Sequence, residues 1–354
     1  MAMSRRSRRL VRSYLALVQR DGLSAALIGP EVGGHGAAER IRGILESTDE
    51  YYADPLSGLS TLQDVLDQRV AEVEAAARSM GLRFDARHVL TALYPLGDVN
   101  AWGAPANSGD LILVSRGALG LTFLTLKINM MSAQMFGEPA LIDRAQTVGA
   151  LADVFAAHFR HGDPWRAPRL PSLTGHRAVM LDLLVNAAAR FMIGHEYAHV
   201  AGRHPHVDRT TLKSADSAVE VYTRLWDDEF DADRVGAHLV LADQRLAAAA
   251  EQDPHFVRRH GLASVAAATG PMYVLLLDLV LHELDGELKV TGYPPAATAH
   301  PHPGKRWDAL WPVIEQEYAN QASPPPPLEL PGGLMRWFEN LFTDLVPAVR
   351  DRLA

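Results

Sequence analysis

A five-residue segment carries the residue types of a metal-dependent hydrolase. His195 and His199 are four positions apart, and Glu196 directly follows the first of them. In a helix, side chains at this spacing lie on one face about one turn apart, so both imidazoles can bind one ion. The arrangement suits zinc, which would take two neutral nitrogens, a third protein ligand and a water. Glu196 is then placed to accept a proton from that water as it attacks a carbonyl.

The composition limits which other ligands are available. The chain has no cysteine, so histidine and carboxylate side chains remain as metal ligands, and thiol nucleophiles are excluded. We therefore expect one Zn²⁺ per chain. The alternative is that the two histidines lie on a half-buried helix and form ordinary hydrogen bonds in the core.

A second acidic segment supplies candidates for the rest of the site. Residues 227–233 read Asp-Asp-Glu-Phe-Asp-Ala-Asp, about 30 positions after the first motif. Glu229 can be the third ligand, and Asp233, one turn later, can accept a hydrogen bond from a ligand histidine. The alternative is a solvated acidic helix face. Apolar residues at 235–241 favour a helix that is buried on one side, and so favour the ligand interpretation.

These segments resemble the paired signatures of the M48 family of gluzincin metallopeptidases. The matching stretches are H-E-Y-A-H-V-A-G-R-H at 195–204 and E-F-D-A-D-R-V-G-A at 229–237. In that family the glutamate of the second motif completes the zinc site. Residues 99–119 are similar to the family's Asn-Ala-Phe segment, which forms a sheet edge over the cleft. His300-Pro301 followed by Arg306 resembles its late His-Pro…Arg motif.

The resemblance implies roles for residues outside the metal site. Asn100, Ala101 and Trp102 would belong to a strand edge that binds an extended peptide through main-chain hydrogen bonds. His300 or Arg306 would stabilise the oxyanion that forms on the scissile carbonyl. Two alternatives stay open: the strands are a hairpin packed in the core, or Arg306 joins the C-terminal part to the helices by an ion pair.

The elements that must position these residues are mostly helical. Apolar periodicity predicts strands at 89–94 and 110–115, separated by a turn-rich link at 97–109. We expect an α+β, predominantly helical fold of the zincin type, with a small β-sheet of three or more strands over the His195–His199 helix. The same patterns predict helices at 10–28, 61–80, 140–159, 176–202, 214–252, 256–288 and 333–353, the last kinked or broken near Pro347.

Three parts of the chain are predicted. Residues 1–60 form a helical extension, whose arginine-rich first 12 residues are expected to be a solvated tail, with contact to an acidic surface as the alternative. Residues 61–322 form the zincin-like domain. Residues 132–175 within it are an insertion, since the chain is longer there than the family's pattern. Residues 323–354 are a linker with four consecutive prolines and a C-terminal helix.

Composition and motifs together predict the class of activity. The chain has 354 residues, 48% of them apolar, and a net charge of −8, which argues against a basic nucleic-acid binder. It shows no transmembrane segment or signal peptide, so a cytoplasmic location is expected. The predicted activity is zinc-dependent endopeptidase cleavage of a protein or peptide substrate. Alternatives are a protease-like sensor without turnover and a zinc amidase acting on a non-protein amide. The oligomeric state is left open.

Overall fold

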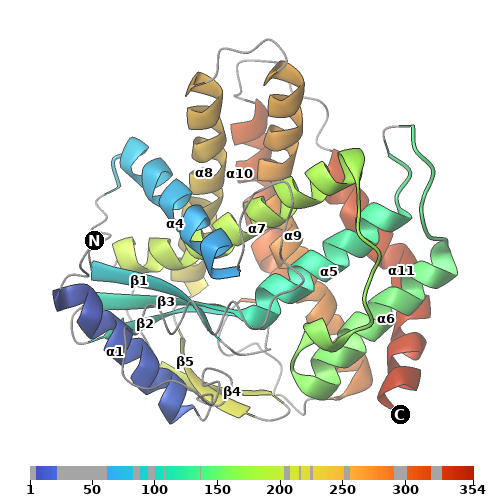
Figure 1. Cartoon of the computed structure of the whole chain (residues 1–354), viewed down its shortest axis with the longest axis horizontal. Coiled ribbons are helices and arrows are strands. Elements are labelled where there is room, and N and C mark those ends of the chain that lie inside the picture. The colour runs from blue at the N-terminus through green and yellow to red at the C-terminus, as the bar shows by residue number, and fades with distance from the viewer. Residues whose placement is uncertain are drawn as a thin grey trace.

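The computed structural model describes most of the chain as helices around a small sheet (Figure 1). The described residues are 5–21, 62–82, 88–94, 100–106, 109–135, 137–202, 208–214, 217–223, 226–250, 256–290, 301–319 and 329–354. Within them the predicted α+β class with predominant helix is confirmed. His300, the four-proline linker and the end of the predicted helix at 10–28 lie outside the described residues.

The three-stranded sheet is mixed, with β3 in its centre. Strands β1 (Val89–Tyr94) and β3 (Gly109–Ser115) pair in parallel, and β2 (Ala101–Ala106) pairs antiparallel with β3. Strand β2 replaces the expected turn-rich link. Its small residues and Pro105 have low strand propensity, but pairing with the apolar β3 forms the strand, and proline is tolerated where a strand lies at an edge.

Helices cover both faces of this sheet (Figure 1). Helix α7 (Gly175–Gly202) crosses one face, where the hydroxyl of Thr91 on β1 lies 3.4 Å from that of Tyr197. Helix α1 (Arg5–Arg20) covers the other face, where the Tyr14 hydroxyl donates to the carbonyl of Leu93. The arginine-rich start is therefore not simply a solvated tail, because Leu10, Tyr14 and Val18 on the same helix are buried.

Helix α7 is the central element of the helical part. Helix α4 (Leu62–Ser79) crosses it, and α8 (Trp226–Ala250) and α9 (Phe256–Leu288) pack beside it. Helix α10 (Pro303–Ala319) lies against α8 and α9. By length and composition alone, α7 and residues 262–288 of α9 are long and apolar enough to cross a membrane. The prediction of no transmembrane segment had not identified these two helices as candidates. In each, 72% of the most apolar stretch is buried inside the protein.

A hairpin precedes α8 and corrects the predicted helix at 214–252. Strands β4 (Asp208–Ser214) and β5 (Ser217–Thr223) pair antiparallel, and the helix begins only at Trp226. The segment 208–223 is rich in threonine, valine and tyrosine, residue types that favour strands over helices. The acidic motif therefore lies in the first turns of α8, close to where the hairpin ends.

The remaining helices extend the same apolar core. Helix α5 (Arg116–Ser132) follows β3 directly and is capped by Ser115, and α6 (Arg144–His161) begins with a capping box at Asp143. A 3₁₀ turn (Pro164–Arg166) leads towards α7. Helix α11 (Glu329–Leu353) packs on α6 and α9 and continues through Pro347 without the expected break. Leu345 and Val349 are fully buried on either side of that proline, and this packing offsets the lost hydrogen bond.

Candidate metal centre

Helix α7 holds the first motif in a buried position. His195, Glu196 and His199 are 6, 3 and 2% exposed, and their ligand atoms lie within 4.8 Å of one another. This buried group could bind a metal ion. The Nε2 atoms of the two histidines are 3.1 Å apart, and Glu196 Oε1 is 3.8 Å from His195 Nε2. Two imidazoles with four-residue spacing therefore point to one place, with a carboxylate beside them.

Helix α8 brings a second carboxylate to the same place. The two oxygens of Glu229 lie 3.4 Å from His195 Nε2 and 3.4 Å from His199 Nε2. Glu229 is fully buried, a costly position for a carboxylate unless cationic or hydrogen-bonding groups surround it. Its equal distance from both histidines distinguishes it from Glu196, which lies farther from His195.

The distances among these atoms fit a tetrahedral ion. Zinc binds histidine nitrogen and carboxylate oxygen at 2.0 to 2.2 Å, so two ligands of a tetrahedral ion are about 3.4 Å apart. The observed separations are 3.1, 3.4 and 3.4 Å. Two nitrogens and one oxygen also suit zinc chemically. The two 3.4 Å distances involve different oxygens of Glu229, one facing each histidine, so the carboxylate is within reach of an ion held by both imidazoles.

Two glycines bring α7 and α8 close enough for this. A Cβ added to Gly194 would lie 3.2 Å from the Cα of Gly236, and one added to Gly236 would lie 3.0 Å from the backbone nitrogen of His195. The helices therefore touch through their backbones beside the first ligand. This contact was not predicted from the sequence. Two glycines inside helical patterns could have indicated it: Gly194 directly precedes His195, and Gly236 lies seven residues after Glu229.

Asp233 and Arg306 complete a chain of contacts behind His195. His195 Nδ1 is 2.9 Å from Asp233 Oδ1. Arg306 donates from Nε to Asp233 Oδ2 at 2.8 Å and from a terminal nitrogen to Oδ1 at 2.6 Å. Because a carboxylate only accepts, the proton of a neutral His195 lies on Nδ1 and the lone pair of Nε2 faces the centre.

The charges of these groups shift one another's pKa. Burial opposes charge on His195, but hydrogen bonds and charge from Asp233 and Glu229 outweigh it and raise the pKa of His195 to about 9. Burial likewise opposes the charge of Asp233, but the Arg306 guanidinium, with His195, outweighs it and lowers the pKa of that carboxyl group. Without a metal, His195 is therefore protonated on Nε2 as well as on Nδ1 at neutral pH, and an ion must displace the proton on Nε2.

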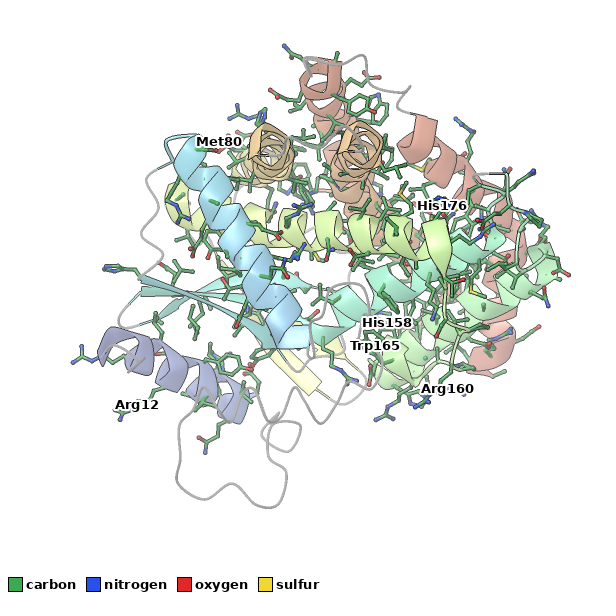
Figure 2. The ribbon with its side chains drawn as sticks, turned by 45° about the horizontal axis from the view of Figure 1, so that its top comes forward. Arg12, Met80, His158, Arg160, Trp165 and His176 are labelled. Carbon is green, nitrogen blue, oxygen red and sulfur yellow. The ribbon has the colours of Figure 1, made fainter. Side chains whose placement is uncertain are left out.

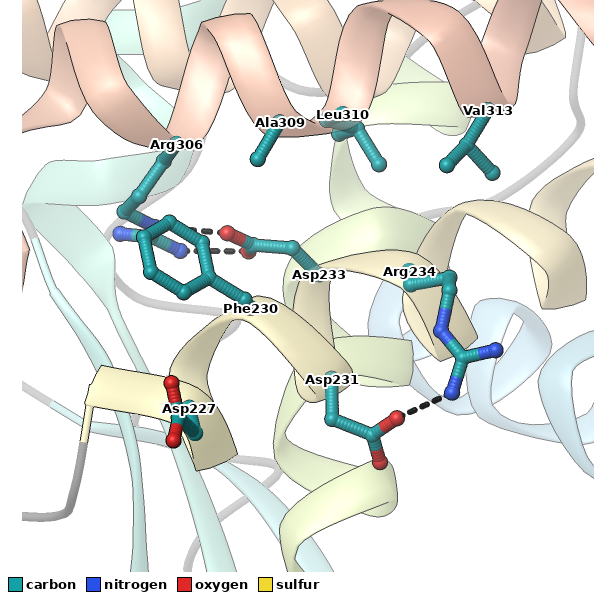
Figure 3. A pocket seen from close by; sticks show the side chains of 9 residues that line it. All are labelled: Asp227, Phe230, Asp231, Asp233, Arg234, Arg306, Ala309, Leu310 and Val313. Atoms are coloured by element: carbon teal, nitrogen blue, oxygen red, sulfur yellow. Dashed lines mark hydrogen bonds and ion pairs between the residues drawn. The ribbon is translucent and has the colours of Figure 1, made fainter.

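Arg306 thus takes the ion-pair position that was one of its two predicted alternatives. Two of its N–H groups bond Asp233, and a third nitrogen lies 3.8 Å from Asp278 on α9. A cavity of about 280 Å³ between α8 and α10 reaches this pair, as Figure 3 shows. Phe230 and Leu310 help to line it. His195 and His199 are not among its lining residues, so the cavity reaches Asp233 and Arg306 but not the two histidines.

The predicted peptide-binding residues lie on and beside β2, which contacts α7. The Ser115 N–H donates to the Asn100 carbonyl at 2.9 Å, and the Asn100 N–H donates to the side-chain hydroxyl of Ser115 at 3.1 Å. Ala101 is half-buried, whereas the Trp102 indole is buried edge-on against Tyr94, whose ring contacts Tyr14 of α1. The Trp102 side chain therefore lies on the sheet face away from α7, which leaves the backbone of β2 as its contribution to the predicted edge.

Comparisons with known proteins give no relative from which to transfer a function. No family model, no curated protein and no solved structure matches the chain. The chemistry of the site therefore rests on the residues and distances described above.

Proposed function

We propose that this protein is a zinc-dependent endopeptidase of the gluzincin type. The observation that carries the proposal is the meeting of His195, His199 and Glu229: the two Nε2 atoms are 3.1 Å apart, each lies 3.4 Å from a different oxygen of Glu229, and Glu196 is beside them. A merely structural zinc site would be closed by four protein ligands. Here a second carboxylate, Glu196, lies next to the three, as hydrolysis requires.

The ion and the chain would have separate tasks. A zinc ion held by the three ligands would polarise the scissile carbonyl and lower the pKa of a water. Glu196 would take the proton of the attacking water and deliver it to the leaving amine. Asp233 would keep the Nε2 lone pair of His195 directed at the ion, and Arg306 would keep Asp233 ionised.

The substrate we propose is an extended peptide segment. Strand β2 is at the edge of the three-stranded sheet and contacts the helix that carries the ligands. Main-chain groups of β2 from Ala101 onward would pair with such a segment as an added strand, whereas both main-chain groups of Asn100 already bond Ser115. Pro105 has no N–H to offer, so we expect pairing to end there.

The deciding experiment compares metal content with turnover. Purified wild type and Glu196→Gln are assayed for bound zinc by mass spectrometry and for cleavage of an unfolded protein such as casein. We expect equal zinc, near one ion per chain, and a rate that falls by about 10²–10⁴-fold in the variant. Glu315→Gln, on the exposed side of α10, is the matched control and should leave both readings unchanged.

Other results would support the rival functions. Undiminished cleavage by Glu196→Gln would contradict the mechanism. Zinc binding without cleavage of any protein by either form would favour a sensor without turnover, which the near-complete burial of the site also suits. Cleavage of small non-peptide amides alone, lost in Glu196→Gln, would indicate a zinc amidase.

A further inference from the structure

The charge of this protein is divided unevenly between α1 and the rest of the chain. Helix α1 contains six arginines and no acidic residue. The whole chain has a net charge of −8, so removing the +6 of α1 leaves −14 for the remainder. Such a separation of charge orients a protein near a charged surface, because one end is attracted and the body is repelled.

The helix buries one face and exposes the opposite one. Leu10, Tyr14 and Val18 recur at four-residue intervals and are at most 2% exposed against the sheet. Arg9 and Arg12 are exposed, and Figure 2 shows Arg12 directed away from the molecule. At about 100° per residue, positions 5 and 8 of the helix backbone lie on the same side of the helix axis as positions 9 and 12. We call Arg5, Arg8, Arg9 and Arg12 the arginine stripe.

The exposed members of the stripe are not neutralised locally. Among the side chains that the structure describes, no carboxylate forms an ion pair with Arg9 or Arg12. At the other end of α1, by contrast, Arg20 pairs with Asp21 at 2.7 Å. The positive charge is thus concentrated in the first two turns of the helix, on a stripe about 10 Å long.

We propose that the arginine stripe binds the phosphate groups of an anionic lipid bilayer. Guanidinium groups bind phosphate oxygens in pairs, and each arginine near an anionic membrane adds to the attraction. Anionic lipids can diffuse within the bilayer and gather at a short rigid stripe. Most of the remaining protein, with its net charge of −14, would lie farther from the membrane than the Debye length of about 8 Å, so its repulsion by the lipid is screened. A nucleic acid favours a longer basic surface, and the body would repel its fixed phosphates.

Binding in this way would set the orientation of the metal centre. The sheet separates α1 from α7, with Tyr14 contacting one face and Tyr197 the other. A protein attached by α1 would hold the metal helix on the side away from the lipid. This inference does not depend on the proposed peptidase activity, because it uses none of the residues of the metal centre.

The test is sedimentation of the full-length protein with vesicles of phosphatidylcholine, alone or mixed with phosphatidylserine. The variants replace all four stripe arginines by glutamine, or all four by lysine. The charge-matched control replaces Arg78, Arg166, Arg336 and Arg350, exposed arginines on other helices and turns, by glutamine. Circular dichroism and thermal unfolding establish that each variant is folded.

We expect wild type and the control to bind the mixed vesicles, the glutamine variant to bind at least tenfold more weakly, and the lysine variant to retain most binding. Binding should weaken as salt increases, and phosphatidylcholine alone should give none. Equal binding by wild type and the glutamine variant would overturn the proposal, and so would absence of binding by wild type. Tighter binding of wild type to duplex DNA or RNA than to mixed vesicles, lost in the glutamine variant, would assign the stripe to nucleic acid instead.

Discussion

Two buried arginines show how different partners give one side chain different tasks. Arg306 on α10 is 8% exposed and bonds a carboxylate that in turn contacts His195. Arg177 on α7 is 2% exposed and donates to backbone carbonyls at the end of α5 and beyond, including those of Ala133 at 2.8 Å and Pro139 at 2.6 Å. The first supports a site, and the second closes a helix end. Burial alone does not distinguish them.

The largest effect on stability is expected at Arg177. In Arg177→Met, the buried carbonyl of Met130 and the part-buried carbonyls of Ala133 and Pro139 lose their donor, and the methionine fills only part of the volume. Each unsatisfied buried group costs about 1–3 kcal/mol, so we expect the free energy of unfolding to fall by about 3–5 kcal/mol. Chemical denaturation measures it. Zinc affinity should be unchanged, and a tenfold loss would contradict the separation of the two regions.

The metal-free site should make stability depend on pH. The pKa of His195 is about 9 in the folded protein, above the ordinary value of 6.5. This protonation therefore stabilises the fold fully below pH 6.5, and its contribution is lost as the pH rises through 9. We expect the free energy of unfolding of chelator-treated protein to fall over this range by at most roughly 3 kcal/mol.

Thermal unfolding at several pH values measures this change. Asp233→Asn should reduce the pH dependence, because the carboxylate that holds the proton on His195 is gone. Arg177→Met should show the same change of stability with pH as wild type, with a lower stability at every pH. A profile for Asp233→Asn as steep as that of wild type would show that another group is responsible.

A smaller effect is expected when Arg306 is changed. In Arg306→Gln, Asp233 stays in place but loses the two donors that orient it. Loss of such outer contacts typically weakens metal binding by about 10–100-fold. Competition with a fluorescent chelator measures the zinc affinity. Arg306→Lys keeps the positive charge but cannot form the paired hydrogen bonds to Asp233, so its zinc affinity should lie between those of wild type and Arg306→Gln. A zinc affinity of Arg306→Gln within twofold of wild type would contradict the role of Arg306 in positioning Asp233.

The site was easier to predict from the sequence than the surrounding fold. His195 and His199 are four residues apart, as are Glu229 and Asp233, and helix geometry alone places each pair on one face. The structure brings all four residues together. Long apolar helices such as α7 and α9 were also found with nearly correct bounds, because their periodicity extends over many residues.

Elements that depend on distant partners were not predictable in the same way. Strand β2 forms because Trp102 and Gly103 pair with β3, and of its own six residues only Trp102 favours a strand. The continuity of α11 through Pro347 likewise depends on packing by Leu345 and Val349. The β4–β5 hairpin is different, since its threonine-rich composition was visible and was outweighed by the strong helical signal that follows it.

The contact of Gly194 with Gly236 also bears on which ions the centre can accept. Because the two backbones already touch, α7 and α8 cannot move closer, whereas nothing in this contact prevents them from separating. Separation of the helices could therefore lengthen the distance from Glu229 to the two histidines around an ion with longer bonds, such as cadmium. Contraction around a smaller ion would have to come from the side chains of His195, His199 and Glu229, because the backbones that carry them are already in contact.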